Sequence, residues 1–123
     1  TLNIFTKFTL SLISSSFICI APQVIANHEC AGQVTKVGLN GTGAVYATIS
    51  NIGSDNVFCS LSENMGEFNR DACSAIYSML LTAQASKQNI KIWFRNDSNT
   101  SCSKGNWQNL PNQYGLYYVR LEG

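Results

Sequence analysis

Side chains able to catalyse a reaction are scarce in this sequence. Nucleophilic catalysis pairs a Ser, Thr or Cys with a base, most often a histidine, and the chain holds a single histidine, His28. We expect His28 to be a mobile residue near the start of the mature protein. The carboxylates are spread over predicted loops and ends, at Glu29, Asp55, Glu63, Glu67, Asp71, Asp97 and Glu122. Two of them could meet in space as a glycosidase pair, but no spacing ties them together, and we predict that the protein is not an enzyme.

Cofactor and metal motifs are also missing from the sequence. There is no G-x-x-x-x-G-K-[ST] loop and no G-x-G-x-x-G segment to cradle a phosphate group. A zinc site would call for a C-x-x-C or H-x-x-x-H pair, and neither occurs. The sequence therefore predicts no cofactor and no metal.

Aromatic side chains on outward strand faces are the remaining candidates, and their chemistry is binding. Flat rings pack on the C–H faces of sugars or stack with bases. The predicted ligand-binding set combines rings expected outside the core with one neighbouring cation: Tyr46, Trp93, Arg95, Trp107 and Tyr118. The alternative is that these rings cover a second apolar patch or form a subunit interface.

The elements that would position these side chains follow a predicted signal peptide. Lys7 precedes an apolar and hydroxyl-rich run over 8–20, and small residues follow at 24 and 26, which is the order of a secretory signal. The run is shorter than the roughly 18 residues that a membrane span needs. We expect cleavage after Ala26, so that 1–26 is the signal peptide. Acylation at Cys19 is the alternative, although bulky residues precede it.

The predicted mature chain, 27–123, has the size of one compact domain. Loss of Lys7 leaves seven basic and seven acidic residues, so its net charge is close to zero. Binding of nucleic acid or anionic lipid depends on clustered Lys and Arg, and we predict neither a nucleic-acid partner nor a membrane span. The expected location is secreted or periplasmic. An even number of cysteines in such a domain, Cys30, Cys59, Cys73 and Cys102, predicts two disulfides.

Alternation of apolar and polar residues predicts the strands. Two strands over 32–39 and 44–50 flank an Asn-Gly turn and form a hairpin. Turn-forming residues over 51–56 precede a short third strand over 57–61. In the second strand the side chains expected to face the core are Val45, Ala47 and Ile49.

One helix interrupts the strands. Asn69 is the expected N-cap, and the helix should end near Lys87. Its predicted apolar stripe is Ala72, Ala75, Ile76, Met79, Leu80 and Ala83. A fourth strand over 89–95 should place Ile90, Ile92 and Phe94 in the core and Trp93 outside. A polar loop over 96–115 and a fifth strand over 116–122 complete the chain.

This order of elements is that of an OB-fold, a five-stranded, partly open Greek-key barrel. We therefore predict a mainly β (α+β) class, with an OB-fold-like five-stranded barrel over 27–123 and one helix between strands 3 and 4. An open α+β sheet with the helix on one face is the alternative. In the barrel the first strand runs antiparallel beside the fourth, which predicts the pairs Cys30–Cys102 and Cys59–Cys73.

Several segments resemble a family of small exported bacterial proteins of uncharacterised function. They are the Y-S-M-L-L-T-A-Q-A-S-K segment at 77–87, the G-x-V strand at 32–34, the V-F-C segment at 57–59 and the S-C-S segment at 101–103. More distantly, the F-C strand, the cysteine before a helix rich in Ala and Leu, and the following I-K-I strand are similar to the B subunits of subtilase-type AB5 toxins. Those proteins are exported OB-folds that assemble as pentamers and bind glycans. No sugar-binding residue can be carried over position by position.

Together these features predict an exported, non-enzymatic binding module whose partner is a glycan or a protein. The resemblance to toxin B subunits implies the glycan. The alternative function is a small structural or inhibitory envelope protein that acts by protein–protein association, including association into a homo-oligomer. A hydrolase is the third hypothesis.

Overall fold

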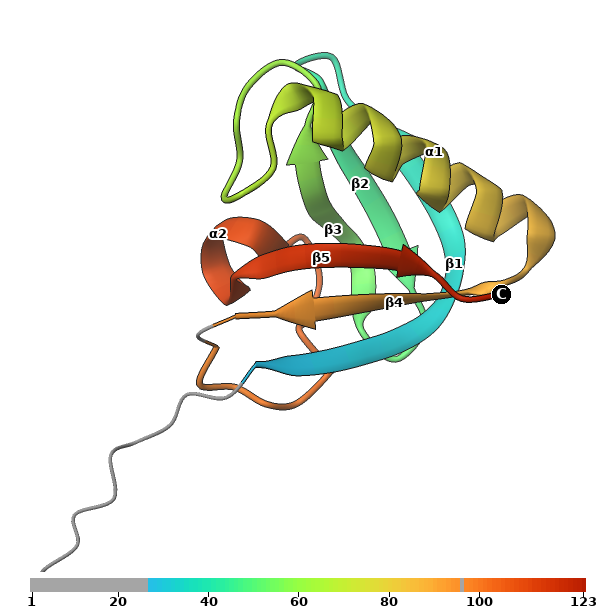
Figure 1. The fold of residues 1–123 in the computed structure, drawn as a ribbon, viewed down its shortest axis with the longest axis vertical. Coiled ribbons are helices and arrows are strands. Elements are labelled where there is room, and N and C mark those ends of the chain that lie inside the picture. The colour runs from blue at the N-terminus through green and yellow to red at the C-terminus, as the bar shows by residue number, and fades with distance from the viewer. Residues whose placement is uncertain (1–26, 96) are drawn as a thin grey trace, which may run out of the picture.

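The structure, a computed structural model, describes residues 27–95 and 97–123. The predicted signal peptide therefore lies outside the described residues. The described chain is mainly β, with one antiparallel sheet and one long helix (Figure 1). Its elements are β1 (His28–Leu39), β2 (Ala44–Ile49), β3 (Gly53–Ser60), α1 (Arg70–Ser86), β4 (Asn89–Phe94), α2 (Leu110–Tyr114) and β5 (Leu116–Leu121).

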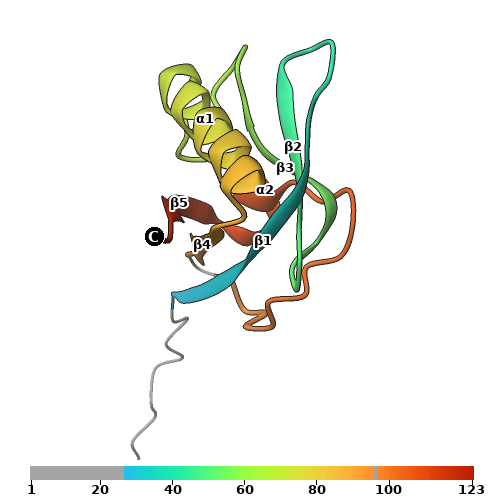
Figure 2. The ribbon, with the colours of Figure 1, turned by 90° about the vertical axis from the view of Figure 1, so that its right-hand side faces the viewer.

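Strand β1 belongs to both halves of the sheet, whose strand order is β3-β2-β1-β4-β5. Its first half, 28–33, pairs with β4, and its second half, 34–39, pairs with β2. Gly32 lies where the pairing changes, and a Cβ at this position would collide with the Ser50 carbonyl oxygen. Figure 2 shows the result, in which β1 runs across the molecule with β4 and β5 on one side and β2 and β3 on the other.

The five strands do not close into the predicted barrel. Closure would need a ladder between the two ends of the sheet, β3 and β5, and these strands are not neighbours in the sheet order. The chain just before α2 lies beside β3 instead: Val57 forms an isolated parallel bridge with Asn109, and its N–H donates to the Gln108 carbonyl at 2.8 Å. The chain that leads into α2 therefore lies beside β3, where a closed barrel would place β5.

The core lies between the sheet and α1, which packs against β1 and β3. All six inward side chains predicted for β2 and β4 are buried: Val45, Ala47, Ile49, Ile90, Ile92 and Phe94. Asn69 is the helix N-cap, as predicted, and accepts a hydrogen bond from the Ala72 N–H at 2.8 Å. The apolar stripe is partly wrong, since Ala75 is exposed while Cys73 is buried. Cys73, which bonds Cys59, is thus part of the buried face of the helix.

Three predicted boundaries differ from the structure. Strand β1 begins at His28 rather than at 32, so that His28 is not a mobile end but a half-buried residue of a strand. Strand β3 begins at Gly53, because a tight turn with Asn51 at φ 72° is already complete at 52. The predicted polar loop contains α2, which Asn109 caps at its start.

Both predicted disulfides are present. Cys30 bonds Cys102 and Cys59 bonds Cys73, with Cα atoms 5.6 and 5.5 Å apart. The first ties β1 to the loop that precedes α2, and the second ties β3 to the first turns of α1. Two such bonds are typical of proteins from an oxidising, extracellular compartment.

Candidate functional site

The predicted ligand-binding residues fall into three separate groups. Trp93 and Tyr118 are cross-strand partners on β4 and β5. Arg95 is exposed just beyond β4. Tyr46 and Trp107 meet beside the β1–β2 turn, with ring centroids 5.8 Å apart. No single site contains the whole predicted set.

Trp93 lies in a ladder of rings and charges that we call the β4–β5 face. Its ring stacks on Tyr118 with centroids 4.8 Å apart, and the Arg120 guanidinium lies 4.8 Å from the same ring. Lys91 lies 5.8 Å from it. Glu122 pairs with both cations, at 3.3 Å from Lys91 Nζ and 2.9 Å from Arg120 Nε. Because these groups contact one another, Trp93 is half-buried and its polar neighbours are already paired.

Arg95 is held away from Trp93. Its guanidinium lies 4.0 Å from the Tyr117 ring, and its Nη1 lies 3.2 Å from a Glu67 carboxylate oxygen. Arg95 thus links the end of β4 to the loop before α1. The expectation that it lies beside Trp93 and donates hydrogen bonds to a shared ligand is not met.

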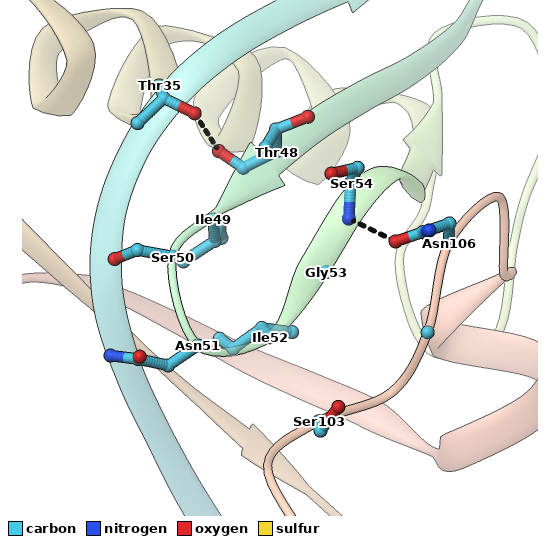
Figure 3. A pocket seen from close by; sticks show the side chains of 11 residues that line it. Thr35, Thr48, Ile49, Ser50, Asn51, Ile52, Gly53, Ser54, Ser103 and Asn106 are labelled. Carbon is cyan, nitrogen blue, oxygen red and sulfur yellow. Dashed lines mark hydrogen bonds between the residues drawn. The ribbon is translucent and has the colours of Figure 1, made fainter.

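A polar hollow of about 500 Å³ lies where the β2–β3 turn meets the loop after Cys102 (Figure 3). Most of its lining residues carry a hydroxyl or amide group, although carbon atoms form the larger part of the surface that they present. The lining comes from three distant segments: Thr35; Thr48, Ile49, Ser50, Asn51, Ile52, Gly53 and Ser54; and Ser103, Gly105 and Asn106. No aromatic ring and no charged side chain lines it. We call this site the polar hollow.

Hydrogen bonds fix the walls of the polar hollow. The Thr35 hydroxyl donates to the Thr48 carbonyl at 3.5 Å, and the Ser54 N–H donates to Asn106 Oδ1 at 2.9 Å (Figure 3). Ser50 Oγ accepts from the Gln33 N–H at 2.9 Å. These bonds use the acceptor oxygens of Ser50 and Asn106, so the Ser50 hydroxyl proton and the Asn106 NH₂ group remain to donate to a ligand.

The sequence did not single out the polar hollow. The sequence predicts a turn over 51–56 and a loop over 96–115, and no pattern in either segment indicates that the two are in contact. The available signal was the density of Ser, Thr and Asn in both segments, together with the predicted Cys30–Cys102 bond, which brings the second segment back to β1.

A buried charge cluster anchors the loop that carries one wall of this hollow. The Lys104 side chain is fully buried, and its Nζ donates to Asp97 Oδ2 and to the Asn99 carbonyl, both at 2.7 Å. It also lies 3.1 Å from His28 Nε2 and 4.7 Å from the Phe94 ring. A lysine enclosed in this way holds the loop against β1 and β4.

His28 is sensitive to this cluster. Burial lowers the pKa of His28 below its ordinary value of 6.5, and the Lys104 cation lowers this pKa further, while Asp97 opposes the shift. Nδ1 is buried without a hydrogen-bond partner among the described residues. His28 therefore stays neutral at pH 7 and stacks on Phe94 with ring centroids 5.2 Å apart.

The described residues were also compared with what a metal site and a membrane span require. Within 27–95 and 97–123, no three His, Cys, Asp or Glu side chains are grouped as a metal site requires. No helix in the same ranges is long and apolar enough to cross a membrane.

The chain was compared with models of protein families, with curated proteins and with solved structures. None of the three comparisons found a match.

Proposed function

We propose that this protein is an exported, non-enzymatic glycan-binding module with an OB-like sheet, and that a saccharide binds in the polar hollow. The hollow carries the proposal. Its volume of about 500 Å³ falls within the roughly 300–1,000 Å³ of small-molecule sites. Neutral hydroxyl and amide side chains both donate and accept hydrogen bonds, which matches the hydroxyl groups of a sugar.

The fold and the disulfides support the same proposal. An OB-type barrel places its first strand antiparallel to the fourth, and β1 pairs with β4 in this way. The curved β1 then gives the two halves of the sheet the order of such a barrel, with the α2 turn in the gap between β3 and β5. The two disulfides favour an oxidising compartment outside the cytoplasm.

Glycan-array binding by the oxidised 27–123 protein tests the proposal. The informative variant is the double substitution Asn51→Gly, Ser103→Ala, which removes an amide and a hydroxyl from the polar hollow. Glycine keeps the positive φ of 72° at residue 51, so the fold should be unaffected. Ser74→Ala, which removes an exposed hydroxyl on α1, is the matched control.

We expect the parent and the Ser74→Ala control to bind the same glycans. The double variant should bind them at least tenfold more weakly at an unchanged Tm. A parent that binds nothing on the array, or a double variant that binds as the parent does, would contradict the proposal.

Association between protein chains is the second candidate function. Strand β5 ends the sheet and is an edge strand, and Tyr118 on it is 46% exposed. An edge strand offers unpaired backbone groups to another chain. Sedimentation velocity of the protein without sugar, over a hundredfold range of concentration, distinguishes the two candidates. Assembly that depends on concentration, together with an empty glycan array, would favour association.

A further inference from the structure

A second, smaller hollow adjoins the polar hollow. It has a volume of about 320 Å³ and lies between the β1–β2 turn and the loop before α2. Its lining consists of Gly38, Leu39, Asn40, Tyr46, Asp55 and Trp107. We call it the Trp107 hollow. Unlike the polar hollow, it has two aromatic rings and a carboxylate.

The two hollows are neighbours because the same three segments line both. Tyr46 and Thr48 are two residues apart on β2 and share a face of that strand; one lines each hollow. Ser54 and Asp55 are adjacent in sequence and are divided in the same way, as are Asn106 and Trp107. A ligand longer than one ring in the polar hollow would therefore reach the Trp107 hollow.

We propose that the two hollows are subsites for one oligosaccharide, and that a neutral pyranose ring stacks on the Trp107 indole. This inference rests on the proposed function, because it assigns a substrate class to the same binding surface. The ligand is at least a disaccharide, with one ring in the polar hollow and the next on Trp107.

The structure holds Trp107 out in solvent on a backbone conformation that is itself unfavourable. The side chain is 68% exposed, and its backbone has a φ of 58°, a left-handed conformation that costs a residue with a Cβ about 1–2 kcal/mol. The Asn56 side chain, 1% exposed, fixes the loop on both sides of Trp107. Its Nδ2 donates to the Gly105 carbonyl at 3.0 Å, and its Oδ1 accepts from the Gln108 N–H at 2.8 Å. Trp107 is thus presented by a rigid loop.

Polar groups beside the indole suit sugar hydroxyls. Asn40 Oδ1 accepts from the Thr42 and Ala44 N–H groups, at 3.0 and 2.9 Å, which fixes the carboxamide at the turn. Its Nδ2 donates to the Tyr46 hydroxyl at 3.4 Å, and the phenol proton remains to donate to a ligand. The half-buried Asp55 carboxylate has no hydrogen-bond or ion-pair partner among the described residues.

The charge of the lining selects a neutral ring. Asp55 is the one charged residue that lines the Trp107 hollow, and no Lys or Arg lines it. A carboxylate repels the carboxylate of an acidic sugar but accepts hydrogen bonds from the hydroxyl groups of a neutral one. We therefore expect an acidic sugar ring to be rejected at this subsite.

The test compares disaccharides with their single rings. Lactose, maltose and N,N′-diacetylchitobiose are titrated against methyl galactoside, methyl glucoside and N-acetylglucosamine by calorimetry on the oxidised 27–123 protein. We expect at least one disaccharide to bind tenfold or more tightly than its own ring. In Trp107→Asn this ratio should fall to near one, because the second subsite is lost. Leu81→Ala, which trims an exposed apolar side chain on α1 (42% exposed), should leave the ratio unchanged.

Folding does not confound this test, because asparagine tolerates a left-handed backbone and Trp107→Asn should melt no lower than the parent. If Trp107→Asn keeps the full preference for the disaccharide, the second subsite is overturned while glycan binding in the polar hollow stands. If neither the six sugars nor the array detects binding to the parent, the proposed function and this inference fail together.

Discussion

The two aromatic surfaces of this molecule differ in what surrounds the rings. On the β4–β5 face, Trp93 stacks on Tyr118 and Arg120, and the cations there pair with Glu122. At the Trp107 hollow, the indole is mostly exposed and Asp55 is unpaired among the described residues. Two outward aromatic residues thus differ in how far their neighbours cover them, and the sequence pattern alone does not separate the two cases.

The largest expected effect comes from the buried charge cluster, which anchors the loop that carries Trp107. Asp97→Ala should lower the free energy of unfolding by about 3–5 kcal/mol, because it leaves the buried Lys104 ammonium without its carboxylate. Urea denaturation measures the loss. Asp71→Asn, a change at an exposed carboxylate in the first turn of α1, is the control and should cost no more than about 1 kcal/mol.

A double variant checks the cause of that loss. Lys104→Met combined with Asp97→Ala removes both charges, and it should be more stable than Asp97→Ala alone. If the double variant is less stable than the single one, the unpaired ammonium is not the source of the effect. Glycan binding by the double variant then shows whether the loop still presents Trp107.

Trp93→Ala sharpens the comparison from the other surface. The alternation of β4 predicts that this change mainly reduces ligand affinity, but the surroundings of the ring favour a loss of stability. We expect the free energy of unfolding to fall by about 1–2 kcal/mol, from the lost aromatic stacking and cation–π contacts, with glycan affinity unchanged. Thermal melts and glycan titration of the same sample separate the two results. Weaker glycan binding with an unchanged melt would make the β4–β5 face the ligand site.

The stability of the protein should also depend on pH, because His28 belongs to the buried charge cluster around Lys104. The pKa of His28 is lower in the folded protein than its ordinary value of 6.5, so the unfolded chain binds the proton more strongly. The contribution of His28 to the free energy of unfolding is therefore fully present above pH 6.5, and it is lost progressively as the pH falls below 6.5. Denaturation at pH 7.5 and 5 measures the difference, which His28→Gln should reduce. An equal difference in His28→Gln would assign the pH dependence to another group.

The smallest effect is expected at Trp107 itself. Trp107→Asn should raise the free energy of unfolding by up to about 1 kcal/mol, since asparagine adopts the left-handed conformation more readily than tryptophan. A fall of more than about 1 kcal/mol would show that the indole supports the fold, and would remove the contrast with Trp93. Denaturant midpoints at a constant m-value provide the measurement.

Local pattern predicted much of the fold and little of the site. Strict alternation fixed which faces of β2 and β4 are buried, and Asn69 marked the start of α1, because both signals lie within one element. The polar hollow joins residues near 50 to residues near 105, and no local pattern links them. Lys104 illustrates the same difficulty, since a lone lysine in a polar segment predicts exposure, and only the meeting of Asp97, His28 and Phe94 around it explains its burial.

The Cys30–Cys102 bond also determines how the protein would respond to mechanical force. The bond closes a covalent ring that contains β2, β3, α1 and β4, so a pull on residues 27 and 123 bypasses these elements. Residues 27–29, which include the start of β1, and the 21 residues 103–123, which include α2 and β5, lie beyond the ring. Together they can lengthen to about 80 Å at the roughly 3.3–3.6 Å per residue of an extended chain. In an optical trap the oxidised protein should yield this short extension alone, by release of β5 and of the first residues of β1, while the reduced protein should lengthen to roughly 320–350 Å.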